Sequence, residues 1–569
     1  MKLPSKKTLG TTTVLLTGLA GLFVAAQPAP PAGDNVFPVT IQIDATKIKG
    51  DLHPIWRFFG ADEPNYAYMK DGKKLLTELG QIGTPTVYFR THSLLVTGDG
   101  TPALKWGSTN AYTEDAQGNP VYDWTIVDKI FDTYHERGVK PYVQIGFMPE
   151  ALSTHPEPYQ HHWKPGDPYG TIVTGWAYPP KDYQKWGELV YQWAKHCGER
   201  YGADEVRSWY WEVWNEPNGY WKGTHEDYFK LYDYAVDGVR RALPDAKVGG
   251  AETAGGPGGT LLKEFLEHCA HGTNYVTGKQ GSPIDFISFH AKGSPKFVDG
   301  HVEMGISNQL KNMNDAFAVI AGFPEMKDKP IVIGESDPDG CAACTGPQLG
   351  YRNGTLYSSY TAASFARAFE IADQHGVNLD GALTWAFEFE DQPYFAGHRV
   401  LATNGIDLPV LNTFRMFGKM GGQRLAIQSS ADAGAQDMIK NGVRGNPDVY
   451  ALTGLEPKKL SIMVWNYHDD DVPGPTAAVD LQLSGLPLDT GNARLTHYRI
   501  DQDHSNAYTA WQKMGSPQQP SADQYAELEK AGQLALLNDP ESVPFQGGKA
   551  SIKINLPRQA VSLLVLEWN

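Results

Sequence analysis

The sequence has few cysteines, few positive charges and almost no long apolar runs, and each shortage excludes classes of protein. Its 49 lysines and arginines are outnumbered by 65 aspartates and glutamates, so the formal charge is −16. A chain this acidic is a poor partner for nucleic acid or anionic membranes, and neutral molecules or cations suit it better. Beyond the first 30 residues no run approaches about 18 apolar residues, so no transmembrane helix is predicted.

The one long apolar run lies at the N-terminus, in MKLPSKKTLGTTTVLLTGLAGLFVAAQPAP. A basic start, an apolar stretch and small residues before a proline-rich lead-in are typical of a secretory signal peptide. We expect a signal peptide over residues 1–26, cleavage near Ala26–Gln27, and an exported protein that is periplasmic or extracellular.

Four cysteines are too few for a disulfide framework. Cys341 and Cys344 form a single C-x-x-C in DPDGCAACTG, and in an exported protein this spacing favours a small loop-closing disulfide over a redox motif or a metal site. Cys197 and Cys269 lie in helix-like stretches and are expected to be buried. The histidines show no ligand spacing, so neither a metal nor a cofactor is predicted.

A length of 569 residues predicts two or three domains. Over residues 51–420, short apolar runs alternate with amphipathic, helix-period segments. Eight strands each followed by a helix are typical of a (β/α)8 barrel. The predicted strands are IWRFFGAD, TPTVYFRTH, KPYVQIGFM, SWYWEVWNE, AKVGGAETA, IDFISFHAK, KPIVIGESD and GALTWAFEF.

The pattern changes after residue 420. Segments such as KKLSIMVWNYHDDD and QAVSLLVLEWN alternate polar and apolar residues between turn signals, which predicts an antiparallel β-sandwich over residues 421–569. The early segment FPVTIQIDA, within residues 27–50, is expected to add a strand to this sandwich, and SADQYAELEKAGQL is expected to form a helix inside it.

Polar or ionisable residues end nearly every predicted barrel strand. In barrel enzymes the active site lies at the carboxyl ends of the strands, so this set predicts an active site rather than a series of structural polar residues. The strand-end residues are Asp62, His92, Glu216, Glu252, His290, Glu335 and Glu388.

The stretch WYWEVWNEPNGYW offers two glutamates on one strand face, since side chains alternate along a strand. Pro217 cannot donate to a sheet ladder, so we expect the strand to end after Glu216. At roughly 3.3 Å per residue, Glu212 would then lie about 13 Å deeper in the barrel. Glu216 is therefore predicted at the mouth, and Glu212 is interpreted as structural.

A second carboxylate, Glu335, follows the buried run in IVIGESDPDG. Asp337 and Asp339 come after it in a Pro/Gly-rich segment and are interpreted as solvated turn residues. Glu216 and Glu335 should face each other across the barrel mouth. A gap of about 5–5.5 Å would suit double displacement, and one of about 6.5–9.5 Å would leave room for an inverting water.

The residues W-N-E-P-N at 214–218 resemble the acid/base strand of the retaining glycosidases of clan A. The segments YDWTIVDKIFDTYHERGVKPYVQIGFMPEAL, YFRTHSLL and RIDQDHSNAYTAWQKMGSPQQPSADQYAELEKAGQL are similar to glycoside hydrolase family 39, which contains β-xylosidases and α-L-iduronidases. The resemblance covers nearly the whole mature chain. It implies that Glu216 is the general acid/base and Glu335 the nucleophile.

The same resemblance implies roles for further residues. Asn215 would hold the sugar 2-hydroxyl, His92 and His290 would line the subsite of the reacting sugar, and Trp385 would form its floor. Glu388 or Glu390 would lie near sugar hydroxyls, with Glu390 the weaker candidate.

Lys292, in SFHAKG, departs from the β-xylosidase pattern, which has tyrosine at this position, and is closer to the iduronidase branch. It would either recognise a uronic acid or pair with Glu335 or another acid and tune its pKa. No arginine that should accompany it in carboxylate recognition is identified from the sequence.

We therefore expect a retaining glycoside hydrolase, an exo-acting β-xylosidase that releases xylose from xylo-oligosaccharides. Ionised Glu335 would attack the anomeric carbon while protonated Glu216 assists the leaving group. The alternatives are an α-L-iduronidase-like or other uronide, arabinoside or galactoside hydrolase, and, more remotely, a non-catalytic carbohydrate-binding protein. The sequence leaves the oligomeric state open.

Overall fold

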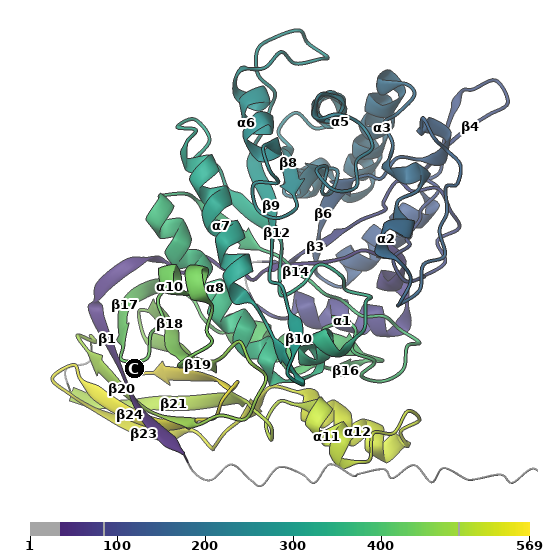
Figure 1. Ribbon diagram of the computed structural model, residues 1–569. Helices are drawn as coiled ribbons and strands as arrows, with labels where there is room; N and C mark the ends of the chain where they lie inside the picture. The colour runs from purple at the N-terminus through teal and green to yellow at the C-terminus, as the bar shows by residue number, and fades with distance from the viewer. Residues whose placement is uncertain (1–34, 84–85, 488–489) are drawn as a thin grey trace, which may run out of the picture.

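The computed structural model describes residues 35–83, 86–487 and 490–569, and the predicted signal peptide lies outside these ranges. Figure 1 shows a barrel surrounded by helices and a second, β-rich domain formed mainly by the C-terminal part of the chain. Among the described residues, no helix has both the length and the apolarity needed to cross a membrane.

The barrel sheet contains only parallel pairings and confirms the predicted (β/α)8 architecture. Its eighth strand is interrupted at Leu383, so that β13 pairs with β12 while β14 pairs with β2 on the other side. The strands are β2 (Phe58–Ala61), β3 (Tyr88–Thr91), β6 (Lys140–Ile145), β7 (Tyr210–Val213), β8 (Lys247–Thr253), β9 (Phe286–Lys292), β12 (Ile331–Asp337), β13 (Leu379–Ala382) and β14 (Thr384–Trp385).

Helices cover the outside of the barrel, and most of them are amphipathic, with an apolar stripe that packs against the strands. Trp211, on the outer face of β7, packs edge-on against Trp193 of α3 with ring centroids 5.6 Å apart. The barrel-side helices are α1 (Lys70–Gly80), α2 (Thr125–Glu136), α3 (Tyr183–Tyr201), α4 (Ala203–Arg207), α5 (His225–Ala242), α6 (Leu261–His271), α7 (Ile306–Ala321), α8 (Thr355–His375) and α9 (Pro409–Phe417).

Loops at the carboxyl ends of the barrel strands carry short elements of their own. The segment between β6 and α3 contains the 3-10 helices η2 (Glu150–Leu152), η3 (Tyr169–Ile172) and η4 (Gly175–Ala177). Three small hairpins join β4 (Tyr112–Glu114) to β5 (Pro120–Tyr122), β10 (Lys296–Val298) to β11 (His301–Glu303), and β15 (Ala402–Thr403) to β16 (Ile406–Asp407).

The second domain is a β-sandwich of ten strands around its own apolar core. The early segment forms β1, which runs antiparallel to β17 and parallel to β20. The sheet is therefore mixed rather than purely antiparallel. The strands are β1 (Val36–Asp51), β17 (Gln423–Ser429), β18 (Asp448–Glu456), β19 (Lys459–Tyr467), β20 (Thr476–Ser484), β21 (Thr490–Ile500), β22 (Ala535–Leu536), β23 (Glu541–Gln546), β24 (Ala550–Leu556) and β25 (Val561–Glu567).

Three helices accompany these strands: α10 (Ala435–Asn441), α11 (Ala507–Lys513) and α12 (Ala522–Gly532). The helix predicted in SADQYAELEKAGQL is α12. It begins with a capping box. The Gln524 backbone amide donates to the Ser521 hydroxyl, and the Ser521 backbone amide donates to the Gln524 side-chain oxygen.

Helix α8 joins the two domains. It is buried on nearly every side because the barrel covers one face and strand β19 lies against another. Arg367 of α8 is 1% exposed and pairs with Asp448 at 2.9 Å and Asp432 at 2.6 Å. A buried charge is tolerated only when it is paired, so these contacts fix the β-domain against the barrel.

Candidate active site

Glu216 reaches the barrel mouth by an irregular backbone and not as the last residue of a strand. Strand β7 ends at Val213, and both Trp214 (φ 72°) and Glu216 (φ 45°) have left-handed backbone conformations. The predicted strand end at Pro217 is therefore wrong, because the chain leaves the sheet earlier. Hydrogen bonds from the Trp214 and Glu216 amides to neighbouring strands hold this conformation, which is costly for residues other than glycine.

Glu212 lies inside the barrel and is fully buried, in agreement with its predicted structural position. Its carboxylate accepts hydrogen bonds from Arg90 Nε at 2.5 Å, the Tyr142 hydroxyl at 2.7 Å and the Ser288 hydroxyl at 3.0 Å. Arg90 and the two hydroxyls therefore satisfy the buried Glu212 carboxyl, although burial and the nearby Glu252 raise its pKa well above the ordinary value.

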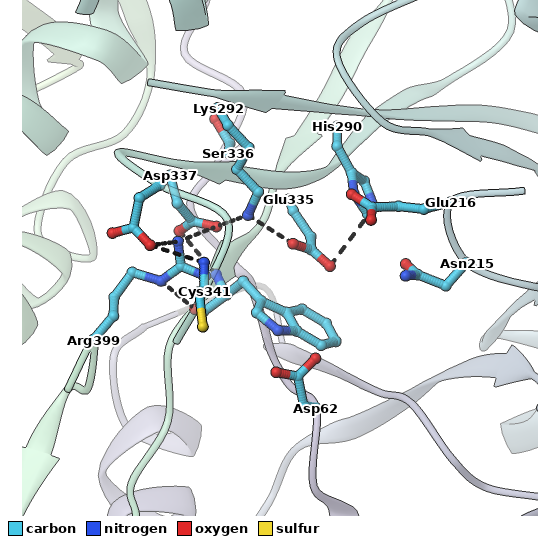
Figure 2. A network of polar contacts seen from close by, with 12 residues as sticks. Asp62, Asn215, Glu216, His290, Lys292, Glu335, Ser336, Asp337, Cys341 and Arg399 are labelled. Carbon is cyan, nitrogen blue, oxygen red and sulfur yellow. Dashed lines mark hydrogen bonds and ion pairs between the residues drawn. The ribbon is translucent and has the colours of Figure 1, made fainter. Parts of the chain in front are cut away.

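Glu216 and Glu335 face each other at the mouth (Figure 2). One carboxylate oxygen of each, together with a ring nitrogen of His290, lies within 4.8 Å of the others. His290 Nδ1 is 2.8 Å from Glu216 Oε1 and its Nε2 is 3.8 Å from Glu335 Oε1. The structure thus brings the two predicted catalytic carboxylates together, with His290 beside both.

Basic side chains surround Glu335. Lys292 Nζ lies 2.6 Å from Oε2, while Arg90 Nη1 and His92 Nε2 each lie 3.7 Å from Oε1. Burial alone would raise the pKa of Glu335, but the charges of His290, Lys292, His92 and Arg90 lower it to about 2. Glu335 is therefore ionised at neutral pH.

A metal ion is not needed to explain this cluster. Donor atoms of Glu216, His290 and Glu335 have a spacing that an ion would accept. However, Lys292 and Arg90 already balance the charge of Glu335 at 2.6 and 3.7 Å, and they would repel an added cation.

His92, Asn215 and Trp385 lie around the same pair. His92 follows β3, and its Nδ1 lies 3.1 Å from Asp62 Oδ1. Its ring is 4.4 Å from that of Trp385, and Asn215 Oδ1 accepts a hydrogen bond from Arg90 Nη2 at 3.0 Å. Three residues predicted to bind substrate are thus held in fixed positions by neighbouring polar and aromatic side chains.

Asp337 and Asp339 are not solvated turn residues, and that expectation is wrong. Strand β12 continues to Asp337, which is 1% exposed, and Asp339 is 8% exposed. Lys292 Nζ lies 2.7 Å from Asp337, and Arg352 donates to Asp339 at 2.8 Å. Arg399 Nη1 lies 3.8 Å from Asp337 (Figure 2). The same nitrogen lies 3.6 Å from Asp339.

The structure does not bring Glu388 and Glu390 to the carboxylate pair. Glu388 is buried and accepts a hydrogen bond from the Gly405 amide at 2.7 Å, and burial raises its pKa to about 8. Glu390 accepts one from the Asp71 amide at the start of α1, at 2.9 Å. Both carboxylates accept hydrogen bonds from backbone amides in this structure. Their role near sugar hydroxyls stays a prediction.

A pocket opens beside the carboxylate pair, and most of the residues that line it are not predicted from the sequence. The side chain of Lys105 is 4% exposed and contacts Asp62, which places a charged pair in the wall. The long segment after KPYVQIGFM contributes to this wall, and its high content of aromatic residues is the only sign of this in the sequence. Its 3-10 turns are too short to show a regular apolar period. The lining side chains other than the predicted ones include Lys105, Trp106, Phe147, His161, Tyr169 and Trp176.

The loop after β12 closes another side of the pocket through Gly340. Cys341 and Cys344 form a disulfide within it, which confirms the predicted loop closure, and Cys197 and Cys269 are free and buried as expected. Arg352 donates to the Cys341 carbonyl at 2.6 Å, so the same arginine that pairs with Asp339 also orders the loop.

A (β/α)8 barrel with two close carboxylates after β7 and in β12 is the arrangement that retaining glycoside hydrolases use. The family described as glycosyl hydrolases family 39 matches residues 39–547. The chain belongs to this family, which confirms the resemblance stated from the sequence.

Both branches of the family occur among the similar proteins. A β-xylosidase of Caldicellulosiruptor saccharolyticus is 28% identical over 430 residues, covering 72% of this chain and 76% of its own. An α-L-iduronidase of Mus musculus is 24% identical over 547 residues, covering 89% and 77%.

Solved structures share the fold. A bacterial orthologue of human α-L-iduronidase has a TM-score of 0.72 at 21% identity, covering 94% of this chain and 84% of its own. A monomeric β-xylosidase from Caulobacter crescentus CB15 has a TM-score of 0.70 at 22% identity, covering 93% and 99%.

Proposed function

We propose that this glycosidase is a retaining, exo-acting β-xylosidase that releases xylose from xylo-oligosaccharides. The observation that carries the retaining mechanism is the separation of Glu216 and Glu335, whose nearest ligand oxygens lie within 4.8 Å. This bound fits the roughly 5–5.5 Å carboxyl separation of double-displacement enzymes better than the roughly 6.5–9.5 Å of inverting ones.

The two carboxylates differ in their surroundings as the mechanism requires. Four cationic or ionisable neighbours keep Glu335 ionised and suited to attack the anomeric carbon. Glu216 is half-buried at the pocket and has one ring nitrogen of His290 as its recorded side-chain partner. It would protonate the leaving oxygen and then take a proton from the attacking water.

The contacts of Lys292 support a neutral sugar. Its Nζ already lies 2.6 Å from Glu335 Oε2 and 2.7 Å from Asp337 Oδ2. A substrate carboxylate would have to compete with these two buried acids for the one ammonium group.

The shape of the pocket supports exo action. Loops after five strands, β2, β3, β6, β7 and β12, supply its walls, including Trp106, Tyr169, Trp176 and Tyr220. Walls on several sides would admit the end of a chain rather than its middle. Asp62 and Lys105 add an acceptor and a donor that would bind sugar hydroxyls.

One observation favours a second candidate, a uronide hydrolase. Both terminal nitrogens of Arg399 are buried without a well-aligned hydrogen bond, close to Lys292 and Asp337. A sugar carboxylate entering between these cations would complete their hydrogen bonding.

A panel of nitrophenyl β-xyloside, β-glucoside, β-galactoside, α-L-arabinoside and α-L-iduronide separates these functions. We expect the highest kcat/KM on the β-xyloside, with the β-anomer of xylose appearing first by NMR. Fastest turnover of the iduronide would establish the uronide function instead. Glu335→Gln serves as the inactive control, and a wild type that hydrolyses none of the panel while binding xylo-oligosaccharides would be a carbohydrate-binding protein.

A further inference from the structure

Glu252 is a buried carboxylate that the proposed mechanism does not use. It lies near the end of β8, is 0% exposed and has a left-handed backbone conformation (φ 52°). Its Oε2 is 2.6 Å from His290 Nε2, while the other ring nitrogen of His290 is 2.8 Å from Glu216 Oε1. Glu252, His290 and Glu216 therefore form a continuous chain that ends at the expected proton donor.

The neighbouring backbone is shaped around Glu252. A Cβ atom added to Gly334 would lie 2.0 Å from Glu252 Oε1, so the residue before Glu335 leaves room for this carboxylate by lacking a side chain. The Glu216 amide also donates to the Glu252 carbonyl at 3.0 Å. Glu252 is thus in contact with the backbone that carries both catalytic carboxylates.

The charges that face His290 favour its protonated form. Burial opposes the imidazolium, but the carboxylates of Glu335 and Glu252 and the hydrogen bond to Glu216 raise the pKa of His290 to about 10. The charged groups around it come from every adjacent strand end: Arg90 and His92 from β3, Glu216 after β7, Glu252 from β8, Lys292 from β9 and Glu335 from β12.

We propose that Glu252 is a positioning residue for the acid–base step, which keeps a proton on His290 Nε2 so that Nδ1 exchanges a second proton with Glu216. This inference rests on the proposed retaining mechanism. A neutral histidine carries one proton, on either nitrogen. With the Glu252 carboxylate 2.6 Å from Nε2 and attracting a proton there, Nδ1 is the nitrogen left to give a proton to Glu216 and to take it back.

The proton balance closes over one turnover. The proton on His290 Nδ1 moves to Glu216, which passes it to the leaving oxygen as the glycosidic C–O bond breaks and Glu335 bonds to the anomeric carbon. Water then attacks that carbon, the bond to Glu335 breaks, and Glu216 takes the proton from water. Transfer of that proton back to His290 Nδ1 restores the starting pair.

The test is Glu252→Gln, which keeps the shape of the side chain and removes its charge. We compare xylobiose, whose leaving group needs a proton, with dinitrophenyl β-xyloside, whose leaving group does not. We expect kcat/KM for xylobiose to fall on the order of 10-fold or more, as part of the 10²–10⁴-fold that general acid catalysis supplies. The dinitrophenyl substrate should change less than about 3-fold.

The pH profile gives a second readout. Loss of the anion beside Nε2 makes the imidazolium easier to deprotonate, so the basic limb of kcat/KM for xylobiose should move to lower pH. Asp233→Asn is the matched control, since Asp233 is also a buried carboxylate beside a histidine, with its Oδ1 3.1 Å from His268 Nε2, but it lies on the outer helix α5. Any loss in this control should be equal for both leaving groups.

Equal losses on both substrates in Glu252→Gln with an unmoved basic limb would overturn the proposal. If this variant does not fold, ¹⁵N NMR of the wild type decides, with the His290 signals assigned by comparison with His290→Gln. A proton retained on Nε2 through neutral pH supports the inference, and a ring protonated only on Nδ1 contradicts it. A wild type that hydrolyses neither substrate would refute the proposed function instead.

Discussion

Replacing Lys292 with methionine should move the acid limit of activity to higher pH. Lys292 Nζ lies 2.6 Å from Glu335 Oε2 and contributes to the lowered Glu335 pKa of about 2. Glu335 must be ionised to act as nucleophile, so its pKa sets the pH below which activity is lost. Methionine retains most of the buried stem while removing the charge.

The expected size of the change follows from the contacts that remain. An opposite charge at this range lowers a carboxyl pKa by about 1–3 pH units, so loss of Lys292 should bring the Glu335 pKa to about 3–5. His290, Arg90 and His92 still face the carboxylate in the variant. With a pKa near 4, only about a tenth of Glu335 would be ionised at pH 3, giving about a 10-fold loss there.

The assay is the pH dependence of kcat/KM on nitrophenyl β-xyloside from pH 2 to 8, with brief incubations and a thermal melt at each pH. Lys311→Met is the control, because Lys311 is an exposed lysine on α7 whose ion pair is with Asp315 and not with Glu335. An acid limb that stays in place in folded Lys292→Met would refute the electrostatic account of Glu335.

Two further changes test other parts of the structure. Glu216→Gln should lower kcat/KM for xylobiose by about 10²–10⁴-fold, measured by steady-state kinetics, and a drop of the same size on dinitrophenyl xyloside would argue against an acid role. Arg367→Met should leave Asp448, which is 0% exposed, without its cation, at a cost of about 3–5 kcal/mol in urea unfolding. An unchanged unfolding midpoint would show that this pair does not hold the two domains together.

The barrel was predictable because its strands are short apolar runs buried on both faces, separated by amphipathic helices of regular period. The strand-end rule then grouped Glu216, His290 and Glu335 at one mouth although they are far apart in the chain. That grouping needs only the direction of parallel strands, which the sequence pattern supplies.

The polar interior was less predictable. Asp337 resembles a turn residue in sequence, yet it is buried because Lys292 and Arg399, from distant segments, meet it there. Likewise the early end of β7 depends on hydrogen bonds to other strands. The alternation of side chains along a strand carries no information about these bonds. Whether a charged side chain is buried depends on the oppositely charged groups that it meets, and the fold is needed to identify these groups.

The placement of β1 has a consequence for how the protein is made. The first described strand pairs with β17 and β20, which are synthesised only after the whole barrel. Until then its edges lack their native partners, and unpaired strand edges are sites of misassociation. Deleting residues from Val36 onward would therefore remove pairings of β1 with β20 and disturb assembly of the C-terminal domain, while the barrel strands keep all their neighbours.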